Sequence, residues 1–250
     1  MSGYGLDGRV AIVTGASRGL GLAAARALLA EGVRVVAAAR SADALDTLAA
    51  EHPGQVEAVA CDMRDVDAVA ALPGIALDRC GGLDVLVNNA GIAPAGAFDE
   101  QRLETWREVL DVNVLAPVAL TRAAAPHLLD QGAGKVINVA STSGLLGKPT
   151  LAAYSASKGA LIQFTKALAA EWAARGIQVN AIAPGAFETD AQQAVLDSPE
   201  VLARRLRKIP AGRMGQPGEI GPLVCWLASN QSDFVSGATL VIDGGESSKL

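Results

Sequence analysis

The stretch "IVTGASRGLGLAAARALLAEG", residues 12–32, decides the fold of this chain. Three glycines, Gly15, Gly19 and Gly21, separate an apolar run from an alanine- and leucine-rich segment of helical period. Such glycines allow a tight turn, close approach to a ligand and packing of a helix against a sheet. The N-terminus of that helix could then bind a pyrophosphate through free N–H groups and its positive dipole end. A plain strand-to-helix turn is the alternative, but the order strand, glycines, helix favours a dinucleotide site.

The alternation of apolar runs with segments of helical period continues along the chain. The predicted strands are residues 9–15, 33–40, 56–62, 83–91, 135–141, 177–185 and 238–245. The predicted helices are residues 19–31, 42–50, 65–78, 101–129, 153–175 and 217–229. Nearly continuous apolar strands are expected when helices cover both faces of a parallel sheet. We therefore predict an α/β fold with a doubly wound sheet of seven parallel strands, in one domain spanning residues 1–250.

Composition and charge limit the classes of function. The chain has 250 residues, 50% of them hydrophobic, and a net charge of -5, which argues against nucleic acid as a partner. We see no secretory signal, and no apolar run approaches the roughly 20 residues of a membrane span. The odd number of widely spaced cysteines suggests reduced thiols, so we expect a cytoplasmic protein. With only two histidines in the chain, we expect neither a zinc site nor any other metal site.

The end of the second predicted strand bears on the choice of dinucleotide. A cofactor with a free 2′-hydroxyl is usually held there by an acidic residue, but this chain has Arg40 and Ser41 after Ala39. Arg18 lies within the glycine loop. Two guanidinium groups could clamp a 2′-phosphate, although each arginine alone could equally be a solvated surface residue. We therefore predict NADP(H) as the preferred cofactor, with NAD(H) as the alternative.

The stretch "YSASKGALIQF" places Tyr154 and Lys158 one helical turn apart on the same helix face. The ordinary interpretation is a core tyrosine beside a lysine whose stem packs and whose head reaches solvent. The catalytic interpretation is a phenol whose acidity the cation tunes, because a free phenol with a pKa of about 10 is a poor acid–base catalyst near neutrality. The attraction between a phenolate and a cation about 4 Å away is roughly 4 kcal/mol at an effective dielectric constant of about 20. Since desolvation acts in the opposite direction, the ammonium has to outweigh it.

Taken together, the motifs resemble the classical short-chain dehydrogenase/reductase (SDR) family over essentially the whole chain. They are "TGASRGLG" at 14–21, "NNAG" at 88–91, "DVNV" at 111–114, "NVAS" at 138–141, "YSASK" at 154–158 and "PG" at 184–185. The resemblance implies a Rossmann-like fold, a homotetramer, and an NAD(P)(H)-dependent oxidoreductase that interconverts a ketone and a secondary alcohol. Its partner would be a small-molecule ketone or alcohol.

The resemblance also implies roles for individual residues. Asn113, Ser141, Tyr154 and Lys158 match the catalytic positions: Ser141 would bond the substrate oxygen, and Asn113 would hold a helix distortion and an ordered water. The positions that match cofactor contacts are Gly15, Ser17, Arg18, Gly19, Leu20, Gly21, Arg40, Ser41, Asp62, Met63, Asn89, Ala90, Gly91, Tyr154, Lys158, Pro184, Gly185, Phe187 and Thr189. Phe187 departs from the usual Ile or Val, so we expect its ring to reshape the roof of the pocket.

Residues 186–214 have the length and position of a lid over the substrate. Within the lid, the apolar positions are Leu202, Leu206 and Ile209, and the basic positions are Arg204, Arg205, Arg207 and Lys208. The basic face could attract a carboxylate, a phosphate or an acidic carrier protein, or could simply be solvated. The candidate substrate-binding residues are Ser141, Ser143, Tyr154, Ala186 and Glu188.

We expect an NADPH-preferring carbonyl reductase whose substrate is a 3-oxoacyl thioester, a keto-sugar or a sugar acid. One alternative is an NAD-linked sugar-alcohol dehydrogenase. The other is a non-catalytic NADPH-binding sensor on the same fold.

Overall fold

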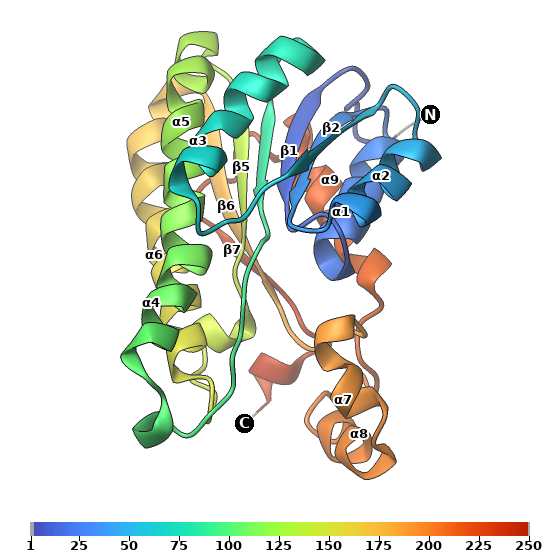
Figure 1. The fold of residues 1–250 in the computed structure, drawn as a ribbon, viewed down its shortest axis with the longest axis vertical. Helices are drawn as coiled ribbons and strands as arrows, with labels where there is room; N and C mark the ends of the chain where they lie inside the picture. The colour runs from blue at the N-terminus through green and yellow to red at the C-terminus, as the bar shows by residue number, and fades with distance from the viewer. Residues whose placement is uncertain (1–2, 250) are drawn as a thin grey trace.

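The computed structural model describes residues 3–249 and contains one parallel seven-stranded sheet, in the order β3-β2-β1-β4-β5-β6-β7 (Figure 1). The strands are β1 Val10–Thr14, β2 Arg34–Ala39, β3 Val56–Ala60, β4 Val85–Asn88, β5 Gly134–Val139, β6 Ile177–Pro184 and β7 Thr239–Ile242. Strand β1 pairs with β2 on one side and β4 on the other, so the strand order reverses there. Ligands of doubly wound sheets bind beyond the carboxyl ends of the strands at such a reversal. The predicted fold is confirmed.

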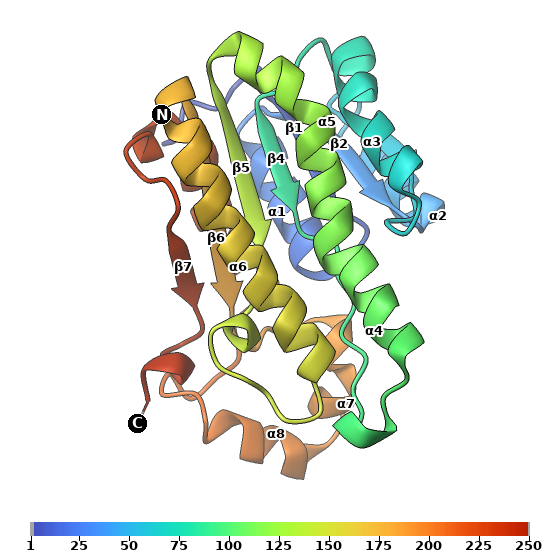
Figure 2. The ribbon, with the colours of Figure 1, turned by 90° about the vertical axis from the view of Figure 1, so that its left-hand side faces the viewer.

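Helices cover both faces of the sheet. They are α1 Gly19–Ala30, α2 Ala42–Glu51, α3 Val66–Ile75, α4 Leu103–Leu110, α5 Ala116–Gln131, α6 Ala152–Trp172, α7 Gln193–Leu196, α8 Pro199–Leu206 and α9 Gly221–Ala228. Helices α1, α2 and α9 pack on one face, and α3, α5 and α6 pack on the other (Figures 1 and 2).

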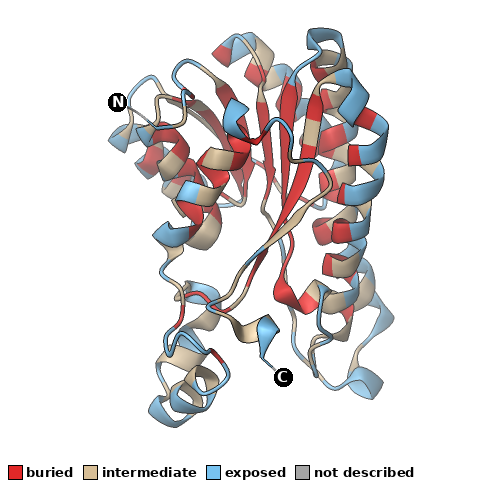
Figure 3. Cartoon of the chain, turned by 180° about the vertical axis from the view of Figure 1, so that it is seen from behind, coloured by how far each residue is buried: buried red, intermediate tan, exposed pale blue. Residues whose placement is uncertain are grey.

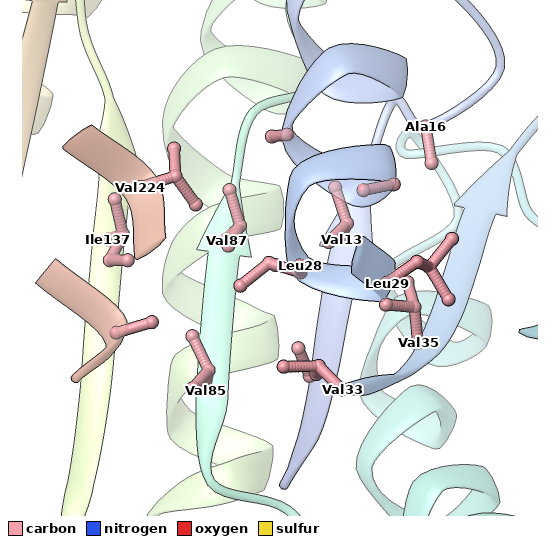
Figure 4. Packing of buried hydrophobic residues seen from close by; sticks show 14 of the residues in the cluster. Val13, Ala16, Leu28, Leu29, Val33, Val35, Val85, Val87, Ile137 and Val224 are labelled. Carbon is pink, nitrogen blue, oxygen red and sulfur yellow. The ribbon is translucent and has the colours of Figure 1, made fainter. Parts of the chain in front are cut away.

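The alternation of side chains along each strand explains why the strands are apolar throughout. In β1, Val13 faces the cluster that contains Leu28 of α1, whereas Ile12 faces the cluster under α5. Figure 4 shows Val13, Val87 and Leu28 packed together between sheet and helix. Figure 3 shows the buried strands between helices whose outer faces are exposed. A strand buried on both faces cannot alternate between polar and apolar residues, as the sequence pattern predicted.

The predicted helix 101–129 is broken into two parts. A π-helical turn, Asp111–Leu115, separates α4 from α5. The combined helix Leu103–Gln131 is long and apolar enough to cross a membrane by length and composition alone, although no such run was expected from the sequence. Its apolar residues Leu120, Ala124 and Leu128 are buried against the sheet, and this packing accounts for its composition.

The segment 186–214 contains the short helices α7 and α8, which lie beyond the carboxyl ends of the strands, near the C-terminus (Figure 1). Leu202 and Leu206 of α8 pack, together with Leu196, against a small buried cluster. That cluster consists of Ala186, Ile209 and Met214. The apolar face predicted for this segment is therefore present.

Candidate active site

Three of the predicted catalytic side chains meet where β5 ends and α6 begins. The Nζ atom of Lys158 lies 5.8 Å from the centre of the Tyr154 ring. Ser141 directly follows β5, and its hydroxyl is close enough to the phenol of Tyr154 to lower the pKa of that group. Ser141 is 8% exposed and Lys158 is 3% exposed, so both act in surroundings largely closed to water.

Burial controls the proton affinities of this group. Desolvation raises the pKa of Tyr154, and the hydrogen bond with Ser141 opposes that rise only in part. Desolvation also lowers the pKa of Lys158 to about 8. The Nζ atom of Lys158 donates a hydrogen bond to the carbonyl of Val139 at 2.7 Å. The expectation that the ammonium outweighs desolvation is therefore wrong for this structure, because burial acts on both groups and disfavours both charges.

The helix distortion expected at Asn113 is the π-helical turn between α4 and α5. The Oδ1 atom of Asn113 accepts from the N–H of Ile92 at 2.9 Å, and its Nδ2 atom donates to the carbonyl of Ile92 at 2.9 Å. Its Nδ2 atom also donates to the hydroxyl of Ser157 at 2.9 Å, and that hydroxyl donates to the carbonyl of Tyr154 at 2.7 Å. Asn113 thus positions the first turn of α6. Ser157 was missed because nothing in the sequence marks it as a link.

A glycine fixes the distance between Ser141 and α6. A Cβ atom at Gly144 would lie 2.6 Å from the backbone carbonyl carbon of Lys158, so no side chain fits there. The short 3-10 turn Thr142–Gly144 therefore packs directly on α6. Within this turn, the N–H of Ser143 donates to the hydroxyl of Ser141 at 3.0 Å, which orients the serine. Ser143 is 4% exposed.

A buried polar network below the site was also missed. The Nδ2 atom of Asn88 in β4 donates to Oδ1 of Asn138 in β5 at 2.8 Å. The Nδ2 atom of Asn138 donates to the hydroxyl of Thr165 in α6 at 2.8 Å. Bonds of this kind in the interior rigidify the elements that they join. An asparagine inside a strand buried on both faces is the sequence signal that could have revealed this network.

The glycine loop has the form of a phosphate cradle. Gly15 and Gly19 have φ angles of +67° and +56°, in the left-handed region. A Cβ atom at Gly21 would lie 2.2 Å from the carbonyl oxygen of Gly15, so only glycine fits. No side chain caps the start of α1, which leaves its first N–H groups free to bind a pyrophosphate. Ser17 lies in the same loop, and Leu20 lies in the first turn of α1.

The segment after β4 lies against this cradle. The hydroxyl of Thr14 accepts from the N–H groups of Asn89 and Ala90, at 3.0 and 3.1 Å. A Cβ atom at Gly91 would lie 3.4 Å from the Nζ atom of Lys158. The structure therefore brings the "NNAG" motif between the glycine loop and Lys158.

The other end of the cradle carries three exposed residues, Arg18, Arg40 and Ser41. The residue that follows β2 is Arg40, not an aspartate or glutamate. Asp62, after β3, is held by Arg64, whose Nε atom lies 3.1 Å from both carboxylate oxygens. Arg64 is the main cause that lowers the pKa of Asp62 to about 2, and Arg40 contributes to the same effect. These positive groups fit a cofactor that carries a 2′-phosphate. Arg64 was not among the predicted residues.

The residues that follow β6 divide between two environments. The ring of Phe187 is 4% exposed and packs on Gly215, where a Cβ atom would lie 2.7 Å from the ring. The expectation that this ring reshapes the pocket roof is wrong, because the ring points into the protein. The side chain of Thr189 faces Gly19 at the start of α1. Ala186 belongs to the buried cluster under α8.

Glu188 lies beside the start of α1. It lines a groove of about 530 Å³ on the outer side of α1, together with Arg26 and Asp190. Ser141 and Tyr154 are not among the described residues that line this groove. Pro184 and Gly185 close the end of β6 against Asp243, because a Cβ atom at Gly185 would lie 2.6 Å from Cβ of that aspartate.

Acidic, histidine and cysteine side chains do not gather into a candidate metal site. Within residues 3–249, no three of these side chains are close enough to hold a metal ion. Cys61, Cys80 and Cys225 are buried free thiols. Burial is the main cause that raises the pKa of each of them, so they remain protonated at neutral pH.

Comparison with known proteins places this geometry in context. A family model described as "Enoyl-(Acyl carrier protein) reductase" matches residues 15–247. The 3beta-hydroxysteroid dehydrogenase 1 of Eggerthella lenta is 42% identical over 245 residues, which cover 96% of this chain and 94% of the relative. A crystal structure of a candidate gluconate dehydrogenase from Agrobacterium tumefaciens has a TM-score of 0.94 and 37% identity, with 98% of each chain covered. A gluconate 5-dehydrogenase from Burkholderia cenocepacia J2315, in complex with NADP and tartrate, has a TM-score of 0.92 and 37% identity, with 98% and 97% covered.

Proposed function

Because the chain belongs to the short-chain dehydrogenase/reductase family, whose members interconvert CH–OH groups and the corresponding carbonyl groups, we propose that it reduces a ketone to a secondary alcohol with NADPH. The observation that supports this most is the group formed by Ser141, Tyr154 and Lys158 beside the glycine loop. The glycine loop explains cofactor binding. It does not explain why the phenol, the hydroxyl and the ammonium of these three residues lie together in one buried site. Proton transfer to or from a substrate oxygen explains that arrangement.

The proton affinities suit the reductive direction at neutral pH. The nicotinamide supplies the hydride when it is bound, and the protein has to supply a proton to the oxygen. Since burial raises the pKa of Tyr154, its phenol is protonated and can act as the acid. Ser141 acts on the pKa of the same phenol, and its hydroxyl can bond the substrate oxygen on which negative charge develops. Lys158 is charged below a pH of about 8 and stabilises the phenolate that remains.

The proposed preference for NADPH rests on Arg40, Ser41 and Arg18 at the adenosine end of the cradle. The gluconate 5-dehydrogenase of similar fold was solved with NADP, which supports the same choice. We expect Arg40→Asp to lower kcat/KM for NADPH by about tenfold or more, because it removes a charge-assisted hydrogen bond and adds a repulsion. The exchange Arg122→Asp, at an exposed position of α5, changes net charge equally and serves as the control. An unchanged kcat/KM for NADPH in Arg40→Asp would contradict this preference.

For the substrate, we propose a keto-sugar or the keto form of a sugar acid, with a 3-oxoacyl thioester as the second candidate. The solved gluconate dehydrogenases of similar fold support the first choice. The description of the matching family model supports the second. The test is a panel of ketones and polyols, assayed with NADPH or NADP⁺ and with NADH or NAD⁺.

The panel also separates the competing functions. We expect the fastest turnover for a ketone with NADPH. Faster oxidation of a polyol with NAD⁺ would indicate a sugar-alcohol dehydrogenase instead. Binding of NADPH without turnover of any compound would indicate a sensor.

We further propose that the protein is a cytoplasmic homotetramer and that residues 186–214 act as its lid. Exposed leucines on the helices beside the site support an assembly, since Leu103 is 68% exposed and Leu115 is 50% exposed. Light scattering coupled to size exclusion would give the mass of the particle. A monomer at micromolar concentration would contradict the tetramer.

A further inference from the structure

Two hydroxyl groups on the buried face of α6 tie this helix to its neighbours. The hydroxyl of Ser157 accepts a hydrogen bond from Nδ2 of Asn113 at 2.9 Å and donates to the carbonyl of Tyr154 at 2.7 Å. The hydroxyl of Thr165 accepts from Nδ2 of Asn138 at 2.8 Å and donates to the carbonyl one turn earlier in α6, also at 2.8 Å. The same construction therefore occurs twice on one helix: an amide bonds a hydroxyl, and that hydroxyl bonds a helix carbonyl.

The two asparagines belong to different parts of the fold. Asn138 lies in β5 and bonds the asparagine opposite it in β4, so Thr165 ties α6 to the centre of the sheet. Asn113 lies in the π-helical turn, which packs against α6 beside α4 (Figure 2). Its amide also bonds the backbone of Ile92, which directly follows the "NNAG" motif. Since a helix rises about 1.5 Å per residue, the two ties lie about 12 Å apart along α6 and together fix its position along its own axis.

Both ties lie in the interior of the protein. The side chains of Asn113, Asn138, Ser157 and Thr165 are fully buried. A hydrogen bond in such surroundings is strong, and a buried donor that loses its partner is costly. Removal of either hydroxyl leaves one asparagine N–H without its acceptor, so the two ties should contribute similarly to the stability of the fold.

Only one of the two ties reaches the candidate catalytic group. The acceptor of the Ser157 hydroxyl is the backbone carbonyl of Tyr154 itself, and Lys158 is the next residue in the chain. The ammonium of Lys158 is held separately, by its bond to the carbonyl of Val139 at 2.7 Å. Thr165 lies two helical turns farther along α6. Because displacement of a reacting group by about 1 Å can lower a rate about a hundredfold, a tie on the backbone of Tyr154 bears directly on the chemistry.

We propose that Ser157 is a positioning residue, whose hydroxyl holds the backbone of Tyr154 on the amide of Asn113 and so sets where the phenol stands. The phenol then keeps its place beside Lys158 during proton transfer. This inference rests on the proposed function, because it assigns that proton transfer to Tyr154. The tie at Thr165 is assigned to the stability of the fold alone.

Two variants that each remove one hydroxyl test the proposal. Ser157→Ala and Thr165→Val should both lower the midpoint of urea denaturation, because each leaves one buried amide N–H unpaired. Only Ser157→Ala should lower kcat for ketone reduction, by about tenfold or more. The KM for NADPH should stay within about twofold of the wild-type value in both variants, because the glycine loop is unchanged. A wild-type kcat in Ser157→Ala, or an equal fall of kcat in Thr165→Val, would overturn the proposal.

A second measurement needs no turnover. In the Tyr4→Phe background, a near-ultraviolet titration of tyrosinate reports the pKa of Tyr154 alone. Ser141 lowers this pKa, and a displaced phenol loses part of that effect. We therefore expect a further rise of the pKa in Ser157→Ala and no change in Thr165→Val. An unchanged pKa in Ser157→Ala would overturn the proposal.

The two measurements separate this inference from the proposed function. A wild type that reduces no ketone, but whose Tyr154 pKa rises in Ser157→Ala alone, would refute the proposed function and still support the positioning by Ser157. Ser157→Cys replaces Ser157→Ala should the latter not fold, since a thiol is a weak donor and a weak acceptor. We expect this variant to show the same rise in pKa and a fall in kcat of about threefold or more. Wild-type values of both would overturn the proposal.

Discussion

The catalytic end of the site and the segment 186–214 are held in place by different interactions. Asn113, Asn138 and Lys158 are nearly or fully buried, and each hydrogen-bonds groups of a neighbouring strand, helix or loop. Helix α8 has no fully buried residue and is held by a small apolar cluster and the Arg205–Glu246 pair. Figure 3 shows this contrast between the buried sheet and the more exposed α7 and α8. The candidate catalytic side chains thus sit in a rigid scaffold, whereas the proposed lid is a weakly held segment, as is common for loops on a rigid scaffold.

The largest effect is expected at the proposed proton donor in the rigid region. Tyr154→Phe removes the hydroxyl and should lower kcat for ketone reduction by about a thousandfold, within the range for general acid catalysis. The chain has two tyrosines, so Tyr4→Phe is the matched control and should leave kcat unchanged. NADPH fluorescence would show whether the variant still binds the cofactor. A kcat above a tenth of the wild-type value would mean that another group donates the proton.

The next largest effect concerns the stability of the same region. Asn113→Ala removes a fully buried amide and leaves the part-buried N–H and carbonyl of Ile92 without their partner. We expect the free energy of unfolding to fall by about 2–4 kcal/mol, measured by urea denaturation. Asn230→Ala, at an exposed position, should cost about 1 kcal/mol or less. An equal decrease in the free energy of unfolding of the two variants would show that this region is held no more firmly than the surface.

Burial of Lys158 makes stability depend on pH. The pKa of Lys158 is about 8 in the folded protein, whereas an unfolded lysine has a pKa of about 10.4. Between these values the unfolded chain binds the extra proton, so stability should rise with pH by up to about 1.4 kcal/mol per pH unit. Lys158→Met should lack this rise when urea denaturation is compared between pH of about 8 and about 10. An identical slope in wild type and variant would show that the ammonium is not desolvated.

The smallest effect is expected in the segment 186–214. A double-mutant cycle with Arg205→Ala and Glu246→Ala should give a coupling free energy of about 1 kcal/mol, as expected for a partly exposed ion pair. Urea denaturation of the two single variants and the double variant measures it. A coupling of about 3 kcal/mol or more would place this segment in the same class as the catalytic region.

Much of the fold could be predicted because the deciding signals are local. Apolar runs buried on both faces predict the strands, and Gly15, Gly19 and Gly21 predict the first strand–helix turn because backbone geometry requires them. The break between α4 and α5 could not be predicted from periodicity. It depends on bonds between Asn113 and Ile92, which are 21 residues apart in the chain.

Parts of the site could not be predicted, because the sequence does not show which partner a side chain meets. Phe187 was expected at the pocket roof, but Gly215 leaves space for its ring in the interior. The bond between Arg64 and Asp62 and the pair between Arg205 and Glu246 were missed, since charged residues in a sequence do not reveal which partner they meet. Only the family resemblance brought Asn113 together with Ser141, Tyr154 and Lys158 before the structure did.

Burial keeps Tyr154 protonated, and Ser141 moderates the rise of its pKa. In a Tyr4→Phe variant, Tyr154 is the last tyrosine, so a near-ultraviolet titration of tyrosinate measures its pKa directly. We expect a pKa above the ordinary value of about 10, and a further rise in Ser141→Ala when the hydrogen bond is lost. A pKa at or below about 10 that does not respond to Ser141→Ala would contradict the account.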